Sequence, residues 1–268
     1  MIPSHLRVWD LVEYSLAERG EGNFLQLYEK LTKGIEAPRS LPQQRNILFG
    51  TIAHELSSYL WQIERNIVQR MYERNRYSRQ EFLDSYRTVI EEQLINGKTS
   101  LHELTEARNK LRSIVPENDI NQSMKNFSQK FVELRYFNLK DMLRQRTLPN
   151  FVAFKNFVRS NCLGPLIVGK IDVTEYDDGY INIRELKVRQ KLAQDTLQLS
   201  LYGILKASET SGQKNPQVRT FLDYVPNGPM LIEINYDYGR TEARRLANAV
   251  VEMLKKSEDE VKEMDVKK

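Results

Sequence analysis

A change in hydrophobic periodicity near residue 148 is the feature that most restricts how this chain can fold. Before it, the chain reads as long helical segments, and only five of the 12 glycines occur there. After it, runs rich in β-branched and aromatic residues are separated by turn sequences. We therefore expect a mainly helical region over residues 1–147 and an α/β region over residues 148–268. Breaks between the helices of the first region are expected near Gly20–Gly22, Gly34–Pro42, Asn75–Ser78, Asn96–Ser100 and Pro116–Asp119.

The second region predicts a mixed β-sheet flanked by helices. Asp177-Asp178-Gly179 and Asn227-Gly228 have the composition of tight turns between strands. Because Lys255–Lys268 is almost wholly charged, we expect the end of the last helix to fray into solvent. The expected strands are Phe151–Arg159, Leu166–Glu175, Tyr180–Val188, Val218–Val225 and Met230–Tyr236, and the expected helices are Ala193–Ser208 and Thr241–Met264.

Composition limits the class of protein. The single cysteine, Cys162, excludes a disulfide framework and any metal site that needs four cysteines from this chain. No apolar run approaches the roughly 18–20 residues that span a bilayer, and Met1–Asp10 lacks the apolar stretch of a signal peptide. We therefore expect a soluble, cytoplasmic protein with no membrane partner. The net charge of +4 permits contact with phosphates but is too small to indicate it.

Two short segments, Gly169–Asp172 and Arg184–Lys187, carry the chemistry. Because side chains alternate along a strand, Glu185 and Lys187 share a face whose preceding positions are apolar, so that face ends in an acid and a base. A hairpin between the segments would place Asp172 where it and Glu185 could hold one divalent cation. Such a cation polarises a phosphodiester and lowers the pKa of a bound water, while Lys187 would orient that water or offset charge on the phosphate. The pattern is that of a metal-dependent phosphodiesterase.

A solvated hairpin with an ordinary ion pair is the plainer interpretation of the same residues. Glu-x-Lys tripeptides are common, and exposed ion pairs contribute little to stability. The following helix favours the functional interpretation, because polar and aromatic residues recur every four positions beside its leucine face and would flank the carboxylates. This stripe comprises Gln194, Gln198, Tyr202 and Lys206.

Four motifs, in order along the chain, resemble those of the PD-(D/E)XK nuclease superfamily, and within it the RecB-like branch that includes the CRISPR-associated exonucleases. Gly50-Thr51-Ile52-Ala53-His54 is similar to that branch's Gly-x-x-x-His helix motif, and Gly169-Lys170-Ile171-Asp172 is similar to its Gly-x-Ile-Asp strand. Glu185-Leu186-Lys187 stands where the branch has (Asp/Glu)-x-Lys, and Gln198-Leu199-Ser200-Leu201-Tyr202 resembles its Gln-x-x-x-Tyr. The resemblance is closest over about Gly169–Glu209.

The resemblance implies a restriction-endonuclease-like fold and a role for each motif residue. Lys187 would be catalytic, and Gln198 and Tyr202 would position the nucleic acid or the lysine. Mn²⁺ or Mg²⁺ would be bound by His54, Asp172 and Glu185, with the backbone carbonyl of Leu186 also available.

The cysteine count departs from the pattern of that branch. Its CRISPR-associated members usually carry four cysteines around an iron–sulfur cluster, so a chain with Cys162 alone is expected to hold no cluster. The departure leaves open the strand polarity of the substrate. It also leaves open whether the pathway is CRISPR adaptation, repair, or plasmid or virus replication.

His54 could also be an ordinary, partly buried histidine on a long helix. The apolar stripe of that helix runs along another side, whereas the positions that flank His54 at helical spacing are Gly50, Ser57 and Ser58. A face with so little bulk would let the strands that carry the two carboxylates approach closely. This favours the ligand role.

Two groups of basic residues indicate a nucleic-acid surface, because arginine neutralises phosphates and tyrosine stacks on exposed bases. The first group comprises Arg65, Arg70, Tyr72, Arg74, Arg76, Tyr77 and Arg79, and the second comprises Arg135, Lys140, Arg144 and Arg146. Solvated helix ends are the alternative. If both groups line one groove, the helical region is a cover that guides substrate over the nuclease core.

Together these features predict a divalent-metal-dependent DNA nuclease that acts as an exonuclease or trims ends, because nothing in the chain resembles a base-reading module. The expected partner is DNA that is single-stranded or has free ends, and a homo-oligomer or a complex with other DNA-processing proteins is left open. The alternative is a nucleic-acid-binding or complex-scaffolding protein that keeps the nuclease fold without turnover. The intact set of Asp172, Glu185 and Lys187 counts against it. A helical interaction protein would require all four motifs to be accidents.

Overall fold

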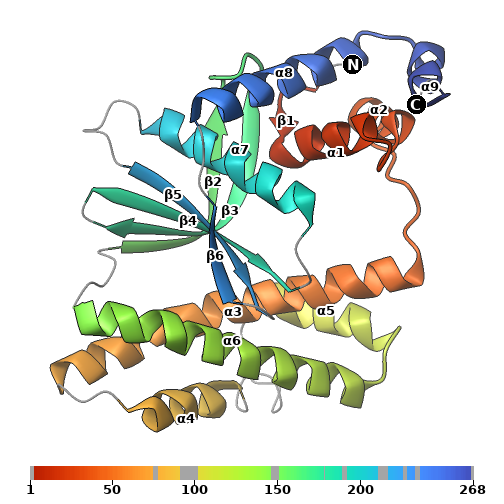
Figure 1. The fold of residues 1–268 in the computed structure, drawn as a ribbon. Coiled ribbons are helices and arrows are strands. Elements are labelled where there is room, and N and C mark those ends of the chain that lie inside the picture. The colour runs from red at the N-terminus through yellow and green to blue at the C-terminus, as the bar shows by residue number, and fades with distance from the viewer. Residues whose placement is uncertain are drawn as a thin grey trace.

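One mixed β-sheet lies between two layers of helices (Figure 1). The computed structural model describes residues 3–74, 78–90, 102–145, 151–177, 179–188, 192–210, 217–225, 228–232 and 236–266. The helices are α1 (Val8–Glu18), α2 (Phe24–Lys33), α3 (Leu41–Glu73), α4 (Arg79–Ile90), α5 (His102–Arg112), α6 (Glu117–Gln145), α7 (Ala193–Glu209), α8 (Tyr236–Leu254) and α9 (Glu258–Val266). The strands are β1 (Leu6–Arg7), β2 (Phe151–Ser160), β3 (Ile167–Asp177), β4 (Tyr180–Lys187), β5 (Gln217–Tyr224) and β6 (Gly228–Ile232). The expected fold class, α/β with a mixed sheet flanked by helices, is confirmed.

The pairing of β3 leaves a notch in the sheet. β2 runs antiparallel along β3 from Ile167 to Tyr176 and occupies one side of it. On the other side, β1 pairs in parallel with Ile167 and Val168, and β4 pairs antiparallel from Val173 to Asp177. Because a strand residue can pair with one strand on each side, β1 and β4 must follow one another along the same side of β3. Residues 169–172 therefore face the space between them, and among the described residues no strand pairs with them on that side.

β5 and β6 extend the sheet beyond β4. β5 pairs in parallel with the whole length of β4, and β6 pairs antiparallel with β5. On the face that carries α3 and α6, a buried ion network joins the three central strands, because Arg184 of β4 bonds Glu175 of β3 at 2.8 Å and Asp223 of β5 at 3.1 Å. The network holds the strands in register beside the notch.

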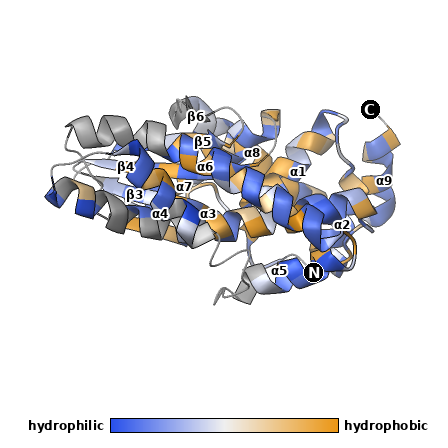
Figure 2. Cartoon of the chain, turned by 90° about the horizontal axis from the view of Figure 1, so that it is seen from below, coloured by the Kyte–Doolittle hydropathy of each residue, from blue (hydrophilic) through white to orange (hydrophobic). Residues whose placement is uncertain are grey.

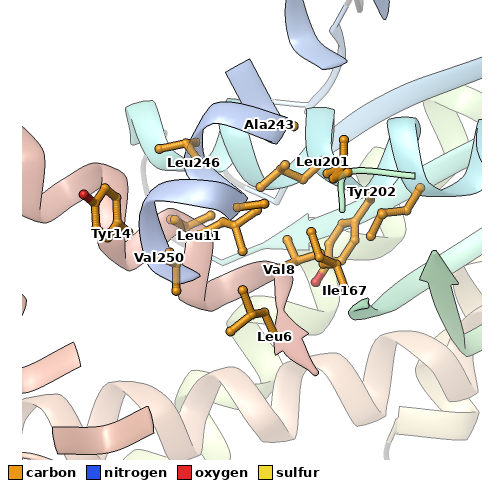
Figure 3. Packing of buried hydrophobic residues seen from close by; sticks show 14 of the residues in the cluster. Leu6, Val8, Leu11, Tyr14, Ile167, Leu201, Tyr202, Ala243, Leu246 and Val250 are labelled. Carbon is orange, nitrogen blue, oxygen red and sulfur yellow. The ribbon is translucent and has the colours of Figure 1, made fainter. Parts of the chain in front are cut away.

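Separate hydrophobic cores lie on the two faces of the sheet. The first joins α1, α2, α7, α8 and α9 to one face, and Figure 3 shows Val8, Ile167 and Tyr202 close together within it. The second joins α3, α4, α5 and α6 to the other face, where Ile52 and Leu56 of α3 are fully buried. Figure 2 shows hydrophilic and hydrophobic residues alternating around the helices, as expected of helices that bury one side.

The N-terminal part contributes to both layers. Its first 33 residues include β1, which joins the sheet, and α1 and α2, which pack in the same core as α7 and α8. α3 to α6 form the opposite layer. The division of the chain between residues 147 and 148 stays a prediction.

Two predicted elements were wrong at the C-terminal end. The strand expected over Met230–Tyr236 is Gly228–Ile232, and Tyr236 begins α8. The single helix expected over Thr241–Met264 is divided into α8 and α9, because the hydroxyl and backbone N–H of Ser257 bond the Glu260 carboxylate and begin a new helix. The other four predicted strands and the helix at Ala193–Ser208 are confirmed to within two residues at each end.

The charged C-terminal segment is also ordered against the rest of the molecule rather than frayed. Val261 of α9 is buried, and the Asp265 carboxylate accepts hydrogen bonds from the backbone N–H groups of Phe24 and Leu25 at 2.9 and 3.0 Å. These N–H groups belong to the first turn of α2, where a carboxylate is stabilised by the helix dipole. The segment therefore caps a distant helix, which its sequence alone does not indicate.

Candidate functional site

Asp172 lies at the end of the notch, where β3 and β4 separate. The last ladder pair is Val173 with Arg184, and beyond it the Asp172 carboxylate takes the place of a strand partner by accepting a hydrogen bond from the Leu186 N–H at 3.0 Å. The same oxygen, Oδ2, lies 3.2 Å from His54 Nδ1 of α3. The predicted proximity of His54 and Asp172 is confirmed, and the helical layer thus reaches the sheet at the notch.

Glu185, Lys187, Gln198 and Tyr202 form a chain of hydrogen bonds between β4 and α7. The Lys187 Nζ donates to Glu185 Oε1 at 3.0 Å and to Gln198 Oε1 at 2.9 Å. The Gln198 Nε2 donates to Glu185 Oε1 at 3.0 Å and to the Tyr202 hydroxyl at 3.1 Å. The Gln198 amide therefore holds both the Glu185 carboxylate and the Lys187 ammonium group in place. Of the predicted polar stripe on α7, Gln198, Tyr202 and Lys206 are buried, whereas Gln194 is half-buried.

Gly169 makes this arrangement possible by its lack of a side chain. A Cβ at this position would overlap the ring of Tyr202 and would lie 3.0 Å from Val8 Cγ2. The ring therefore rests directly on the backbone of β3, and Figure 3 shows it near Ile167 of that strand. This close approach brings α7 near enough for Gln198 to reach Glu185. The glycine of the Gly-x-Ile-Asp motif is required by close packing and not by its φ angle.

The buried charges of the site shift one another's pKa values. Burial, followed by the nearby Asp172 carboxylate, raises the pKa of Glu185 to about 7. Burial is the largest influence on Asp172 and would raise its pKa, but the charge and hydrogen bond of His54, the Leu186 N–H and the charge of Lys187 together hold that pKa below its usual value. Burial is also the largest influence on His54 and would lower its pKa, but the charge and hydrogen bond of Asp172 and the charge of Glu185 together raise it. Two carboxylates crowded in a buried site favour a cation between them.

Asp195 belongs to the site and was missed from the sequence. It is fully buried in the first turn of α7, and its Oδ1 lies 3.9 Å from Lys187 Nζ. Its Oδ2 accepts hydrogen bonds from the Leu192 N–H at 3.0 Å and from the Tyr224 hydroxyl at 3.1 Å. Leu192 is the N-cap of α7, and Asp195 stands three residues later, where a capping box has its acidic residue. This spacing is the feature of the sequence that could have identified Asp195.

The donor set suits a hard divalent cation. Carboxylates, a backbone carbonyl and an imidazole are ligands that Mn²⁺ accepts, and the buried Oε2 of Glu185 makes no hydrogen bond to the described residues. Within the same residues, no three histidine, cysteine, aspartate or glutamate side chains are already grouped as a metal site. His54 and Asp172 contact each other directly instead.

A hollow of about 610 Å³ opens onto part of the site. His54, Leu186, Lys187 and Gln198 form part of its wall. The remainder comes from α1, α3, α6 and the end of β4, and includes Trp9, Arg45 and Phe49. Lys187 is thus reachable from solvent even though its partners Glu185 and Gln198 are buried.

The two basic groups predicted to contact nucleic acid are only partly described. Arg70, Arg74 and Arg79 are exposed, and Arg74 forms an ion pair with Glu81 at 3.2 Å. Arg76, Tyr77 and Arg146 lie outside the described residues, as do the side chains of Arg65, Tyr72, Lys140 and Arg144. For Arg135 the prediction of a surface contact was wrong, because its guanidinium is buried and bonds the Glu64 carboxylate at 2.6 and 2.9 Å.

The likeness to known proteins is at the level of the fold. No family model matches the chain, and no curated protein matches it. A crystal structure of a provisionally assigned exonuclease from Eubacterium rectale is similar, with a TM-score of 0.53 and 11% sequence identity over 94% of this chain and 82% of that chain. This likeness supports a nuclease-like fold.

None of the helices within the described residues has the length and apolarity needed to cross a lipid bilayer.

Proposed function

We propose that this protein is a divalent-metal-dependent DNA nuclease of the RecB-like branch, acting as an exonuclease or trimming ends. The observation that carries the proposal is the meeting of Asp172, Glu185, Lys187 and His54 from three separate elements at the notch of the sheet. All four belong to the sequence motifs that resemble those of the nuclease superfamily. The likeness of the fold to a provisionally assigned exonuclease supports the same class of reaction.

The cation would be Mn²⁺ or Mg²⁺, held by Asp172, Glu185, His54 and the Leu186 carbonyl. When bound, it would polarise the phosphodiester and lower the pKa of a water molecule. Because His54 Nδ1 and Asp172 Oδ2 contact each other at 3.2 Å, the two groups would have to exchange this contact for the metal.

Lys187 would hold the attacking water or offset the charge that develops on the phosphate. Its ammonium group is suited to this role because Gln198 and Glu185 fix its position while the hollow keeps it accessible. Hydrolysis would break a P–O bond of the DNA, with the water oxygen bonded to phosphorus and a proton delivered to the leaving oxygen. Gln198 and Tyr202 are positioning residues, because they act through Lys187 and Glu185.

Cleavage of end-labelled single- and double-stranded DNA, with Mn²⁺, Mg²⁺ or a chelator, tests the proposal. Asp172→Asn and Glu185→Gln should abolish cleavage, since each removes a negative ligand. Lys187→Ala should leave metal binding largely intact and lower the rate by roughly 10²- to 10³-fold, as the loss of one electrostatic group does. Glu252→Gln and Lys255→Ala, which alter an exposed ion pair of 2.6 Å elsewhere, should cleave normally.

The alternative function predicts a different result. A scaffold that keeps the fold without turnover would bind DNA equally with and without metal and would cleave neither substrate. Cleavage that continues in the chelator, or in all three site variants, would show that the notch is not the active site. Calorimetric titration with Mn²⁺ in the absence of DNA separates loss of the metal from loss of catalysis.

A further inference from the structure

The hollow beside the notch has a wall that suits an anion with an aromatic part. Its wall contains the cationic side chains of Arg45 and Lys187 and the aromatic side chains of Trp9 and Phe49. No aspartate or glutamate is among the described residues that line it. Its volume of about 610 Å³ lies within the roughly 300–1,000 Å³ of typical ligand sites. A nucleotide combines one negative phosphate with one aromatic base.

Trp9 is exposed although its neighbours are not. Val8, Asp10 and Leu11 are each at most 1% exposed, whereas Trp9 is 39% exposed. It is also held firmly, because α1 begins directly after β1, and β1 pairs with β3 at Ile167 and Val168, just before the notch. A large exposed aromatic side chain on a fixed support is what base stacking requires.

Arg45 supplies an available cation on the same wall. Its guanidinium lies 5.6 Å from the centre of the Phe49 ring, and within the described residues it forms no ion pair. The ring keeps a cation in place without neutralising it. The guanidinium thus remains available for a phosphate.

A neighbouring hollow of about 720 Å³ provides an internal comparison. It shares Trp9 with the first, but its cationic groups are already neutralised. Arg7 pairs with Asp10, Lys30 with Glu13 and Arg39 with Glu36. Lys187 is also paired, with Glu185, so Arg45 is the difference between these two hollows: among the described residues it has no carboxylate partner.

We propose that Trp9 and Arg45 form a subsite for an unpaired nucleotide of the DNA strand, in which Trp9 stacks on the base and Arg45 contacts a phosphate. The subsite rests on the proposed nuclease function, because it adjoins His54 and Lys187 in one hollow. A base inside a duplex is already stacked on both sides and cannot reach Trp9. The subsite therefore selects single strands and unpaired ends over blunt duplexes.

The fluorescence of Trp9 gives a test that does not depend on cleavage. The chain has two tryptophans, so Trp61→Phe leaves Trp9 as the reporter. An oligothymidylate of about eight nucleotides, within the usual site size for single strands, is titrated into this variant in a chelator. Quenching of Trp9 is expected, and a blunt duplex should cause none.

Affinity for the labelled oligothymidylate is then measured by anisotropy. Trp9→Ala should weaken binding by roughly 5- to 150-fold, as the loss of one base–aromatic stack does, and Trp9→Phe should retain most of it. Arg45→Ala should lower the slope of log affinity against log salt concentration by about 0.7, the value for one phosphate contact on a single strand. Tyr238→Ala, which removes a 74% exposed aromatic residue outside the hollow, should change neither quantity.

The outcomes separate this inference from the function on which it rests. If the protein cleaves DNA with Mn²⁺ but Trp9→Ala binds like the parent, the subsite is wrong and the nuclease stands. If Trp9 is quenched and Arg45→Ala lowers the salt slope by the expected amount, but no metal supports cleavage, the subsite stands and the nuclease is wrong. Equal quenching by a blunt duplex overturns the preference for unpaired nucleotides.

Discussion

Lys155 of β2 forms an ion pair with Glu55 of α3, the residue that follows His54. Its two neighbours in β2 pair with the residues on either side of Asp172, so Lys155 lies level with Asp172 across the sheet. Lys155 also adopts a φ of 48°, in the left-handed region that non-glycine residues seldom occupy in a strand. The ion pair therefore fastens α3 to the sheet beside the contact between His54 and Asp172.

Removal of this ion pair should reveal coupling between sheet and helix. A double-mutant cycle with Lys155→Ala and Glu55→Gln should give a coupling free energy of about 0.5–3 kcal/mol in urea unfolding, because both side chains are largely buried, at 25% and 10% exposure. The exposed pair of Lys110 and Glu106 is the matched control, with an expected coupling of about 0.3–0.5 kcal/mol. Coupling no larger than the control would mean that the pair does not fasten α3.

Gly169→Ala should lower stability and disturb the hydrogen bonds that link Glu185, Lys187, Gln198 and Tyr202. The new methyl group would overlap Tyr202, so we expect a loss of about 1–3 kcal/mol in the free energy of unfolding and a lower cleavage rate as Gln198 is displaced. In Gly50→Ala, in α3, the added Cβ has no atom within 4 Å. This variant should instead stabilise the protein by about 0.5–1 kcal/mol. Thermal and urea unfolding of both variants measures the difference. Equal effects would show that the close approach at Gly169 is unimportant.

His54→Ala should alter metal preference more than fold. An imidazole suits Mn²⁺ better than Mg²⁺, so the parent should work better with Mn²⁺. In the variant, Mn²⁺ affinity should fall roughly 10- to 100-fold and the advantage of Mn²⁺ should shrink, because the remaining ligands are oxygens. Calorimetric titration with each metal, alongside the far-ultraviolet circular dichroism spectrum, measures this. Unchanged Mn²⁺ affinity would make His54 a packing residue only.

Arg135→Ala should destabilise the protein strongly. Arg135 and Glu64 are only 3% and 4% exposed, so the substitution leaves a buried carboxylate without its partner. We expect a loss of about 3–5 kcal/mol in the free energy of unfolding. Arg74→Ala, which breaks an ion pair whose arginine side chain is 64% exposed, should change it by less than about 0.5 kcal/mol. A small effect at Arg135 would contradict its buried position.

Glu117 should contribute a stability that depends on pH. Hydrogen bonds from Arg112 and then Arg108 lower the pKa of Glu117 to about 2 in the folded protein. A carboxylate with a lowered folded-state pKa stabilises the fold above its unfolded-state pKa, and that stabilisation is lost as the pH falls towards the folded-state value. Parent and Glu117→Gln should therefore differ in unfolding free energy at pH 7 and converge between about pH 4.5 and pH 2. A difference that stays constant with pH would exclude this role.

Local patterns in the sequence determined most of the secondary structure and indicated the candidate site residues other than Asp195. The alternation that placed Glu185 and Lys187 on one face of β4 is a property of any strand, and the helical spacing of Gln198 and Tyr202 is a property of any helix. The residue types of Asp172 and His54, in their motifs, indicated a metal site without any knowledge of the fold. These inferences needed only contacts within one element.

Contacts between distant parts of the chain decided the strand pairing, the capping of α2 and the burial of individual charged residues. Nothing near Leu6 indicates that it pairs with Ile167, and nothing near Asp265 indicates that it caps α2. Arg135 has the charge of a surface residue, and only the approach of Glu64 from another helix makes its burial favourable. A side chain's charge and shape are set by its own sequence position, but its burial and partners depend on which elements pack against it. For that reason the sequence alone could name the residues of the notch, and the tertiary structure alone could show that β1, β4 and α3 bring them together.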